Sequence, residues 1–208
     1  MVDFKILPPI FYMDSYLTVK KPARVIINIK KSKFIASLKN VENEKEAKNF
    51  INEIKKEFKD ASLNPYAYVV NDIFNSSDDS EPLNTAGKPI LDVILKKNLK
   101  NVVIVVTRYF GGIKLGVGGL IRAYREAALK GIEASGTIEK FYEEEISFFV
   151  DYEFFGEINK TIQKYRCKIL EKKMENNAFF KISIRKRDKE NFLNEILKKT
   201  KGKVKLSF

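Results

Sequence analysis

The sequence predicts an α+β protein made of two domains, one over residues 1–138 and one over residues 139–208. Three observations support this prediction. Val102–Val106 is a wholly apolar, β-branched run, which is typical of a strand buried on both faces of a sheet. A glycine-rich segment and a helical pattern follow it directly. The hydrophobic pattern then starts again after Ser135-Gly136, which indicates a second domain.

The first domain is predicted to begin with a β-hairpin. Val25–Lys30 alternates in side-chain character and predicts a strand, and Phe34–Leu38 predicts its antiparallel partner. Lys31-Ser32-Lys33 is the expected connection between them. Residues 1–20 carry a weaker pattern, and we expect them to be irregular with at most an edge strand.

A helix and a third strand are expected next. Asn43 is a candidate N-cap because Glu46 follows at the capping-box spacing, and apolar residues then recur at helical intervals. Tyr66–Val70 predicts the following strand. Further on, Pro89 suits the first position of a short helix over Ile90–Leu95, which leads into the central strand.

The segment Asn75–Lys88 is polar, turn-rich and longer than a plain connection needs. It carries three carboxylates, Asp78, Asp79 and Glu81, with Thr85 close behind. Such carboxylates can bind a divalent cation or act as acid and base. They can equally cap helix amides or form an ion pair with Arg108, as acidic turns often do. We therefore treat the segment as a candidate site and assign no metal ligand or catalytic residue.

A second candidate site follows the central strand. Thr107 and Arg108 are its first polar residues and are expected to emerge at the strand's end. The candidate anion- or nucleic-acid-binding residues are Arg108, Gly111, Gly112, Lys114, Gly116, Gly118, Gly119 and Arg122. The first amides of a helix lack intrahelical partners, and the helix dipole favours negative charge there. Alternatively, the glycines only permit a tight turn and close packing of a helix on a strand.

The remaining pattern predicts one long helix and a second domain. The helix starts at Gly119, carries Leu120, Tyr124, Ala127 and Ala128 on one stripe, and weakens near Gly131. The elements expected after residue 138 are a strand over Ile146–Val150, a helix over Phe154–Tyr165, strands over Cys167–Lys173 and Ala178–Ile184, a helix capped by Asp188, and a strand over Val204–Phe208. That order is βαββαβ, the order of a ferredoxin-like domain.

The composition excludes several kinds of site. The chain has no histidine, which removes the usual general base and every Ser-His or Cys-His pair. Its single cysteine, Cys167, cannot form an intramolecular disulfide. Any metal site would have to be built from carboxylate oxygens. We expect no cofactor and favour a protein that is not an enzyme.

The charge balance points to a polyanion partner. The formal net charge is +12, and basic residues are in excess in both proposed domains. Such a balance favours RNA or the ribosome, whereas a lysine-rich solvated surface is the alternative. No run approaches the roughly 20 apolar residues of a membrane helix, and Pro8-Pro9 interrupts the apolar run near the N-terminus. The sequence therefore predicts a cytoplasmic protein without a membrane partner.

Three motifs resemble the signature of the YigZ/IMPACT family. They are Ser77-Asp78-Asp79-Ser80-Glu81-Pro82, Thr85-Ala86-Gly87-Lys88-Pro89-Ile90-Leu91 and Val105-Val106-Thr107-Arg108-Tyr109-Phe110-Gly111-Gly112-Ile113-Lys114-Leu115-Gly116. The resemblance covers about residues 15–130, and the βαββαβ tail is similar to the second domain of the bacterial YigZ branch. Leu63 stands where the family usually has histidine, so a role for that histidine cannot hold here. Ser80 and Asn84 stand where glycines are usual.

The resemblance implies both folds and a class of function. It implies an N-terminal domain of the ribosomal-protein-five, domain-2-like type, a fold shared with a late domain of elongation factor G and with the GHMP kinases. It implies a tail like the last, ferredoxin-like domain of elongation factor G. Two domains in that order imply a protein that faces the ribosome or RNA. The eukaryotic IMPACT branch, which lacks this tail, regulates translation through protein contacts.

Three functions stay open on the sequence alone. The first is a non-enzymatic nucleic-acid- or ribosome-binding protein that regulates translation. The second is a small-anion or phosphate binder, or an enzyme, that uses the acidic segment 77–88 together with the glycine segment 108–119. The third is a protein–protein interaction module. We expect the two segments to face one another, with Arg108 paired to a carboxylate, because a buried charge without a partner is prohibitive.

Overall fold

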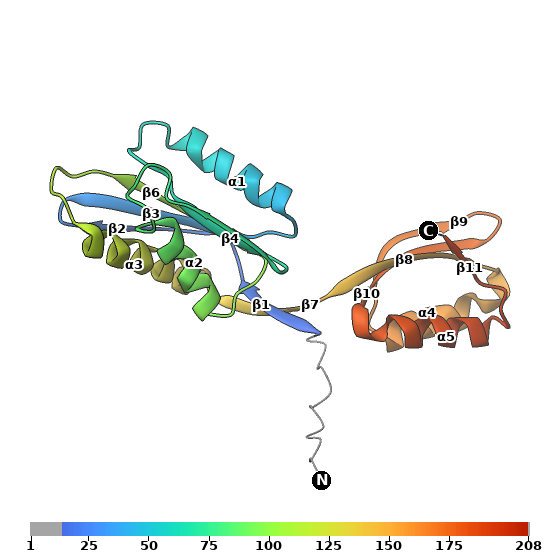
Figure 1. Cartoon of the computed structure of the whole chain (residues 1–208). Coiled ribbons are helices and arrows are strands. Elements are labelled where there is room, and N and C mark those ends of the chain that lie inside the picture. The colour runs from blue at the N-terminus through green and yellow to red at the C-terminus, as the bar shows by residue number, and fades with distance from the viewer. Residues whose placement is uncertain (1–13, 208) are drawn as a thin grey trace, which may run out of the picture. The chain divides into compact units, whose positions relative to one another are not determined.

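The computed structural model describes residues 14–207 (Figure 1). The expectations placed on residues 1–13 and on Phe208 lie outside the described residues. Internal contacts divide the chain into two compact units. We call Tyr16–Lys140 the N-terminal unit and the part that begins at Phe141 the C-terminal unit. Both combine helices with antiparallel sheets, so the predicted α+β class is confirmed.

The N-terminal unit is built on a five-stranded sheet. Its strands, in spatial order, are β2 (Ala23–Ile29), β3 (Ser32–Asn40), β6 (Val102–Tyr109), β4 (Tyr66–Val70) and β5 (Ile73–Ser77). All neighbours are antiparallel. The predicted central strand therefore lies in the middle of the sheet. A separate two-stranded sheet joins β1 (Ser15–Val19) to β7 (Thr137–Phe141).

Three helices cover the two faces of this sheet. Figure 1 shows α1 (Glu44–Glu57) on one face, and α2 (Gly87–Lys96) and α3 (Val117–Ser135) on the other. Alternate residues of β6 supply the two cores: Val102, Ile104 and Val106 pack with α2 and α3, and Val103 and Val105 pack with α1. The strand is buried except at its last residue, Tyr109, because both of its faces meet a helical layer.

The predicted hairpin is present, but its turn is shorter than expected. β2 pairs with β3, and the connection is Lys30-Lys31 alone, with φ values of 45° and 68°. A two-residue turn with positive φ at both positions matches the twist of its flanking strands. Ser32 and Lys33, which were expected in the connection, therefore already belong to β3.

The start of α1 follows the prediction closely. Asn43 is the N-cap, and its side-chain oxygen accepts a hydrogen bond from the backbone N–H of Glu46 at 2.9 Å. The Glu46 carboxylate reaches back to the backbone N–H of Glu42 at 3.0 Å, one residue before the cap. The start of α2 differs, since the helix begins at Gly87 and Pro89 is its third residue.

Two strands differ from the prediction. β5 includes Asn75-Ser76-Ser77, which reads as loop in the sequence; as an edge strand it pairs on one side only and tolerates polar residues. β6 continues through Thr107 and Arg108 to Tyr109. Those two residues do not emerge at the strand's end but are buried, because β3 pairs with the strand that far.

The helix α3 also runs further than expected. It passes through Gly131 and ends at Ser135, with Gly136 in a left-handed conformation (φ 67°) as its C-cap. A Cβ at Gly131 would lie 2.8 Å from Leu38 Cδ2, so the glycine lets the helix sit close to the sheet. The predicted stripe is confirmed: Leu120, Tyr124, Ala127 and Ala128 are all buried.

The C-terminal unit has the predicted βαββαβ order. Its elements are β8 (Glu143–Val150), α4 (Phe155–Lys164), β9 (Lys168–Met174), β10 (Ala178–Arg185), α5 (Lys189–Lys199) and β11 (Lys205–Ser207), with short 3₁₀ turns at Tyr152–Phe154 and Lys186–Asp188. The sheet order is β11-β8-β10-β9, all antiparallel. Both helices lie on one face (Figure 1). Asp188 stands at the N-cap of α5, but its side chain makes no capping hydrogen bond.

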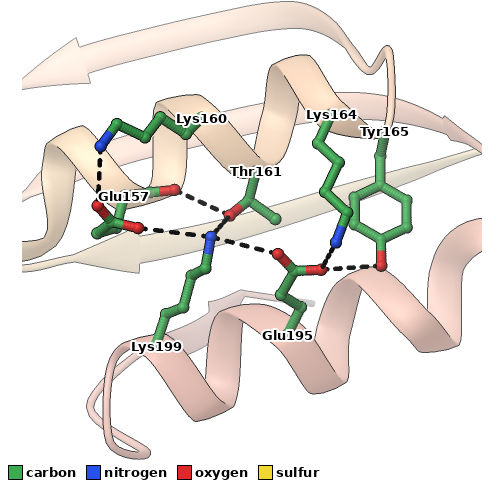
Figure 2. Close-up of polar contacts among 7 residues, drawn as sticks. All are labelled: Glu157, Lys160, Thr161, Lys164, Tyr165, Glu195 and Lys199. Atoms are coloured by element: carbon green, nitrogen blue, oxygen red, sulfur yellow. Dashed lines mark hydrogen bonds and ion pairs between the residues drawn. The ribbon is translucent and has the colours of Figure 1, made fainter.

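Polar side chains tie α4 to α5 at the surface of this unit (Figure 2). Glu195 accepts hydrogen bonds from Lys164 at 2.6 Å and from the Tyr165 hydroxyl at 3.1 Å. Lys199 contacts Glu195 at 3.2 Å and donates to Thr161 Oγ1 at 3.0 Å. The hydrogen bond from Lys164 lowers the pKa of Glu195 to about 2.

None of the helices within residues 14–207 is long and apolar enough to cross a membrane.

The Glu195→Gln variant tests whether this network stabilises the unit. The folded-state pKa of Glu195, about 2, lies below the roughly 4.3 of an unfolded glutamate. Its stabilisation is therefore present above about pH 4.3 and is lost as the pH falls toward 2. We expect Glu195→Gln to lower the free energy of unfolding at pH 7 by about 1 kcal/mol or less and to flatten its decline between pH 5 and pH 2. Urea unfolding at stepped pH measures both.

The matched control for this experiment is Glu133→Gln. Glu133 forms an exposed pair with Lys130 on its own helix, at 3.0 Å and with 60% of its side chain exposed. Its substitution should leave the pH profile of the C-terminal unit unchanged. Equal profiles for Glu195→Gln and the parent chain would show that the network does not stabilise the unit.

Candidate functional site

A buried cluster joins the two candidate segments of the N-terminal unit. Arg108 comes from β6, Glu81 from the acidic segment and Tyr124 from α3. Arg108 Nη1 donates to Glu81 Oε1, and the Tyr124 hydroxyl donates to the same oxygen at 2.7 Å. Only 8% of the Arg108 side chain and 5% of the Glu81 side chain are exposed. The predicted pair between Arg108 and a carboxylate of the acidic segment is confirmed.

The surroundings of this cluster keep its charges in place. The Arg108 guanidinium lies 5.5 Å from the ring centres of both Phe34 and Phe110. Burial, together with the neighbouring Glu81 carboxylate, raises the pKa of Tyr124 far above its usual value, so the phenol stays protonated and donates. Arg108 Nε has no hydrogen-bond partner among residues 14–207. The acidic and glycine segments thus meet at one buried ion pair.

The other carboxylates of the acidic segment are also engaged within the unit. Asp78 accepts hydrogen bonds from the backbone N–H groups of Ala86 at 2.8 Å, Gly87 at 2.9 Å and Asn84 at 2.7 Å, so it caps α2 from outside the helix. Asp79 accepts from the backbone N–H of Asn64 at 2.8 Å. These contacts favour the capping interpretation of the acidic segment.

Thr85 is likewise part of the turn. It is buried, and its hydroxyl donates to the carbonyl of Pro82 at 2.6 Å. Asn84 has a φ of 61°, the left-handed conformation that glycine adopts most readily. Within the described part of the chain, no group of three or more acidic or sulfur side chains is arranged to hold a metal ion.

The first half of the glycine segment is fixed by the fold. Phe110 N–H donates to Ser62 Oγ at 3.1 Å, and Gly111 N–H donates to Ser32 Oγ at 3.2 Å. A Cβ at Gly111 would lie 2.0 Å from the backbone carbonyl carbon of Lys31, so a side chain there has no room. Gly112, with a φ of 84°, adopts a conformation that side chains disfavour. The contacts of Gly111 hold the segment against the β2–β3 turn.

The second half of the segment leads into α3 and is open to solvent. Gly116 is the N-cap and has no side chain that could accept hydrogen bonds from the first amides of the helix, and the first turn carries no acidic residue. Gly118 is exposed and needs no special backbone conformation. Arg122 Nη1 lies 3.6 Å from the point that a Gly118 Cβ would occupy, so a guanidinium flanks the helix start. Gly119 is half-buried and packs against Leu115.

Exposed cations come from the glycine segment, from α3 and from the β2–β3 turn that Gly111 contacts. We call the following residues the basic loop surface: Lys30, Lys31, Lys33, Phe110, Lys114 and Arg122. Its five cations make no ion pair with the residues that the structure describes. Lys33 Nζ lies 4.6 Å from the ring centre of Tyr109, and Phe110 is 49% exposed.

The sequence reasoning identified only part of this surface. It named Lys114 and Arg122 but missed Lys30, Lys31, Lys33 and Phe110. These residues could not be recognised from the local sequence, because pairing between distant strands brings them to the surface: the β3–β6 register places Lys33 opposite Tyr109. Arg108, in contrast, was named as a binding residue but lies buried in the ion pair with Glu81.

The chain is similar to known proteins that carry the IMPACT name. A family model described as the Impact N-terminal domain matches residues 30–132. The IMPACT family member YvyE of Bacillus subtilis is 38% identical over 194 residues, which are 92% of this chain and 89% of that protein. The IMPACT family member YigZ of Escherichia coli is 39% identical over 117 residues, or 54% of this chain and 57% of that protein. A solved structure titled "Crystal structure of an hypothetical protein" is 28% identical with a TM-score of 0.70, and the match covers 93% of this chain and 97% of that one.

Arg108→Ala tests the buried ion pair as a structural clamp. Removing the guanidinium leaves the Glu81 carboxylate buried without its cation, which typically costs about 3–5 kcal/mol. We expect a loss of that size in the free energy of unfolding of the N-terminal unit, measured by urea denaturation. The control is Arg125→Ala, which breaks a pair with Asp92 whose side chains are 43% and 32% exposed and should cost about 1 kcal/mol or less. Equal losses in both variants would contradict the clamp.

Gly111→Ala tests the close contact between the glycine segment and the hairpin turn. The new Cβ would overlap the backbone of Lys31, and relieving such an overlap typically costs about 1–3 kcal/mol. We expect a lower melting temperature by circular dichroism. Gly118→Ala is the comparison, because its Cβ has room and alanine favours a helix; its melting temperature should be unchanged or higher. The contact is unimportant if Gly111→Ala melts with the parent chain.

Proposed function

The chain belongs to the YigZ/IMPACT family, and on that premise we propose that it is a non-enzymatic nucleic-acid- or ribosome-binding protein that acts on translation in the cytoplasm. The basic loop surface is the observation that carries this proposal. Its lysines and arginine have no carboxylate partners in the described part of the chain, whereas Lys55, Lys100 and Arg125 of the same unit are each paired with an aspartate.

The chemistry of this surface matches the phosphate backbone of RNA. Lysine and arginine side chains, backbone N–H groups and helix N-termini are the groups that contact nucleic-acid phosphates. Lys114 and Arg122 provide the side chains, and the glycines at the start of α3 let a phosphate approach the backbone amides. The half-exposed ring of Phe110 offers a face on which an unpaired base can stack. The net charge of +12 would favour encounter with a polyanion.

A small-anion site at the same helix start is the second candidate. It is favoured by the uncapped first turn of α3 and by the guanidinium of Arg122 beside it. The carboxylates of the acidic segment do not contribute to this candidate, since they are engaged in contacts of the fold. A thermal-shift screen with phosphate and nucleotides separates the two: a small anion alone should raise the melting temperature only if this candidate holds.

A protein partner is the third candidate, and the edge of the five-stranded sheet favours it. β5 is an edge strand, and its Ile73 and Phe74 are 52% and 62% exposed. An exposed edge strand can pair with a strand of another chain. Capture of one protein that survives nuclease treatment of the sample would support this candidate over RNA.

The salt dependence of RNA binding tests the proposed function. We expect the chain to bind single-stranded RNA at low salt and to lose affinity steeply as salt rises. Combining Lys31→Ala, Lys114→Ala and Arg122→Ala should reduce the slope of log affinity against log salt by about 0.7 for each lost phosphate contact. Fluorescence anisotropy with a labelled oligonucleotide, and cosedimentation with ribosomes, measure the effect.

A matched variant of equal charge controls this experiment. Lys45, Lys56 and Lys97 are exposed lysines of the same unit outside the basic loop surface, and none forms an ion pair with a described residue. Replacing all three with alanine removes the same charge and should change the slope little. Equal effects from both triple variants, or no binding at low salt, would contradict the proposal.

A further inference from the structure

The sheet of the C-terminal unit carries its two helices on one face, which leaves the other face without a helix of its own unit (Figure 1). The two middle strands of this sheet are β8 and β10. Side chains alternate along both strands, so Phe148 and Phe180 point into the core while Phe149 and Phe179 point outward. We call the side without helices the outer face.

Two aromatic rings lie next to each other in the middle of the outer face. Phe149 is directly opposite Phe179 in the β8–β10 register, and the ring centres are 4.9 Å apart. Phe149 is 40% exposed, although the adjacent core residue Phe148 is fully buried. A single exposed apolar side chain needs no explanation, but here the exposed ring of Phe149 lies beside the partly exposed ring of Phe179 on the central strands.

A hollow borders these rings. Its volume is about 410 Å³, and it is lined by Phe149, Phe179, Lys173, Glu175, Asn176 and Asn177. The hollow therefore combines flat aromatic walls with the amides of two asparagines at the β9–β10 turn. The side-chain amide of Asn177 donates one hydrogen bond to Asp151 at 2.9 Å, and the oxygen of the same side-chain amide can still accept one. Amide groups of this kind can recognise the hydrogen-bonding edge of a base.

Lysines surround the aromatic pair on the same face. Lys173 is opposite Phe179 on β9, with its Nζ 6.0 Å from the ring centre. Lys205 is opposite Phe149 on β11, and it forms no ion pair with any residue in 14–207. Lys181 follows Phe179 on the outward side of β10. Across the four strands, the ring pair therefore lies between Lys205 on β11 and Lys173 on β9.

Two of these lysines are paired with carboxylates, but the pairs are exposed. Lys173 contacts Glu171 at 2.6 Å, and Lys181 contacts Glu145 at 2.7 Å, with 37–59% of each of the four side chains exposed. Exposed pairs contribute about 1 kcal/mol or less, so a phosphate can replace the carboxylate at small cost. The face can therefore offer three cations to a polyanion.

From this arrangement we propose that the outer face of the C-terminal sheet is a stacking platform for single-stranded nucleic acid. Two adjacent bases stack on Phe149 and Phe179, Lys173 and Lys205 contact the flanking phosphates, and Asn176 and Asn177 face a base edge. Aromatic side chains on a four-stranded sheet and flanking cations are the means by which proteins bind unpaired bases. A duplex keeps its base faces stacked internally and does not fit this surface. The proposal rests on the proposed function for its ligand class and adds a second surface, in the other unit.

Replacing the rings tests the platform directly. Fluorescence anisotropy at low salt compares a labelled 12-nucleotide oligouridine with a duplex RNA of the same length, using the full chain. We expect Phe149→Leu and Phe179→Leu each to weaken single-strand binding about 5- to 150-fold, because stacking of one base on an aromatic ring contributes about 1–3 kcal/mol. Duplex binding should change less than twofold. Phe149→Tyr keeps a ring and should retain the affinity.

A base analogue and an aromatic control complete the experiment. The fluorescence of 2-aminopurine falls when the base stacks, so a 2-aminopurine oligonucleotide should be quenched by the parent chain and less quenched by Phe149→Leu. Phe74→Leu is the matched control, because this phenylalanine is 62% exposed on the edge strand of the N-terminal unit. It should leave both signals unchanged. Melting curves of each variant check that the C-terminal unit remains folded.

The outcomes separate this inference from the proposed function. The platform is overturned, and the proposed function stands, if RNA binds but neither leucine variant changes affinity or quenching while the basic-loop triple variant does. The platform is also overturned if single strand and duplex weaken equally. If the unaltered chain binds no RNA at low salt, both proposals fail. Loss of single-strand binding in both leucine variants, with retention in Phe149→Tyr and Phe74→Leu, establishes the platform.

Discussion

The ion pair between Arg108 and Glu81 is the contact on which the N-terminal unit depends most. Its partners are almost fully excluded from water, and Tyr124 donates a second hydrogen bond to the same carboxylate oxygen. Burying two charges is costly unless they are paired and hydrogen bonded. The central strand, the acidic segment and the helix α3 must therefore come together in one arrangement. Any shift of one of them would leave a buried charge without its partner.

The polar residues of this unit fall into two groups, those that stabilise the fold and those that are exposed to solvent. Asp78, Asp79 and Glu81 each accept hydrogen bonds within the unit, so the acidic segment holds the helices and the strand in place. The glycine segment is held at Gly111, whereas Gly112, Gly116 and Gly118 are exposed, as are Lys114 and Arg122. The residues that stabilise the fold and the residues that can meet a ligand are thus different sets. The family motifs cover both sets without distinguishing them.

Local signals in the sequence predicted most of the fold. Asn43 with Glu46, the Val102–Val106 run and the apolar stripe after Gly119 each report on their own neighbourhood, and each was placed correctly. The local errors lie at the ends of elements, as at the hairpin turn and the start of α2. The other errors concern contacts between distant segments. β5 was missed because its pairing with β4, rather than its own polar residues, makes it a strand. Phe149 and Phe179 could not be recognised as neighbours, because only the β8–β10 register brings them together.

The close fit at Gly131 has a mechanical consequence for the other end of α3. The helix packs closely against Leu38 of the sheet at this glycine. Gly118 lies thirteen residues earlier, about 20 Å away at the helical rise. We expect a bulkier residue at position 131 to tilt α3 away from the sheet and so to move the guanidinium of Arg122 relative to the hairpin turn. We therefore expect the packing of Gly131, which contacts neither half of the basic loop surface, to influence the distance between them, and a spin-label distance between positions 31 and 122 would report any such tilt.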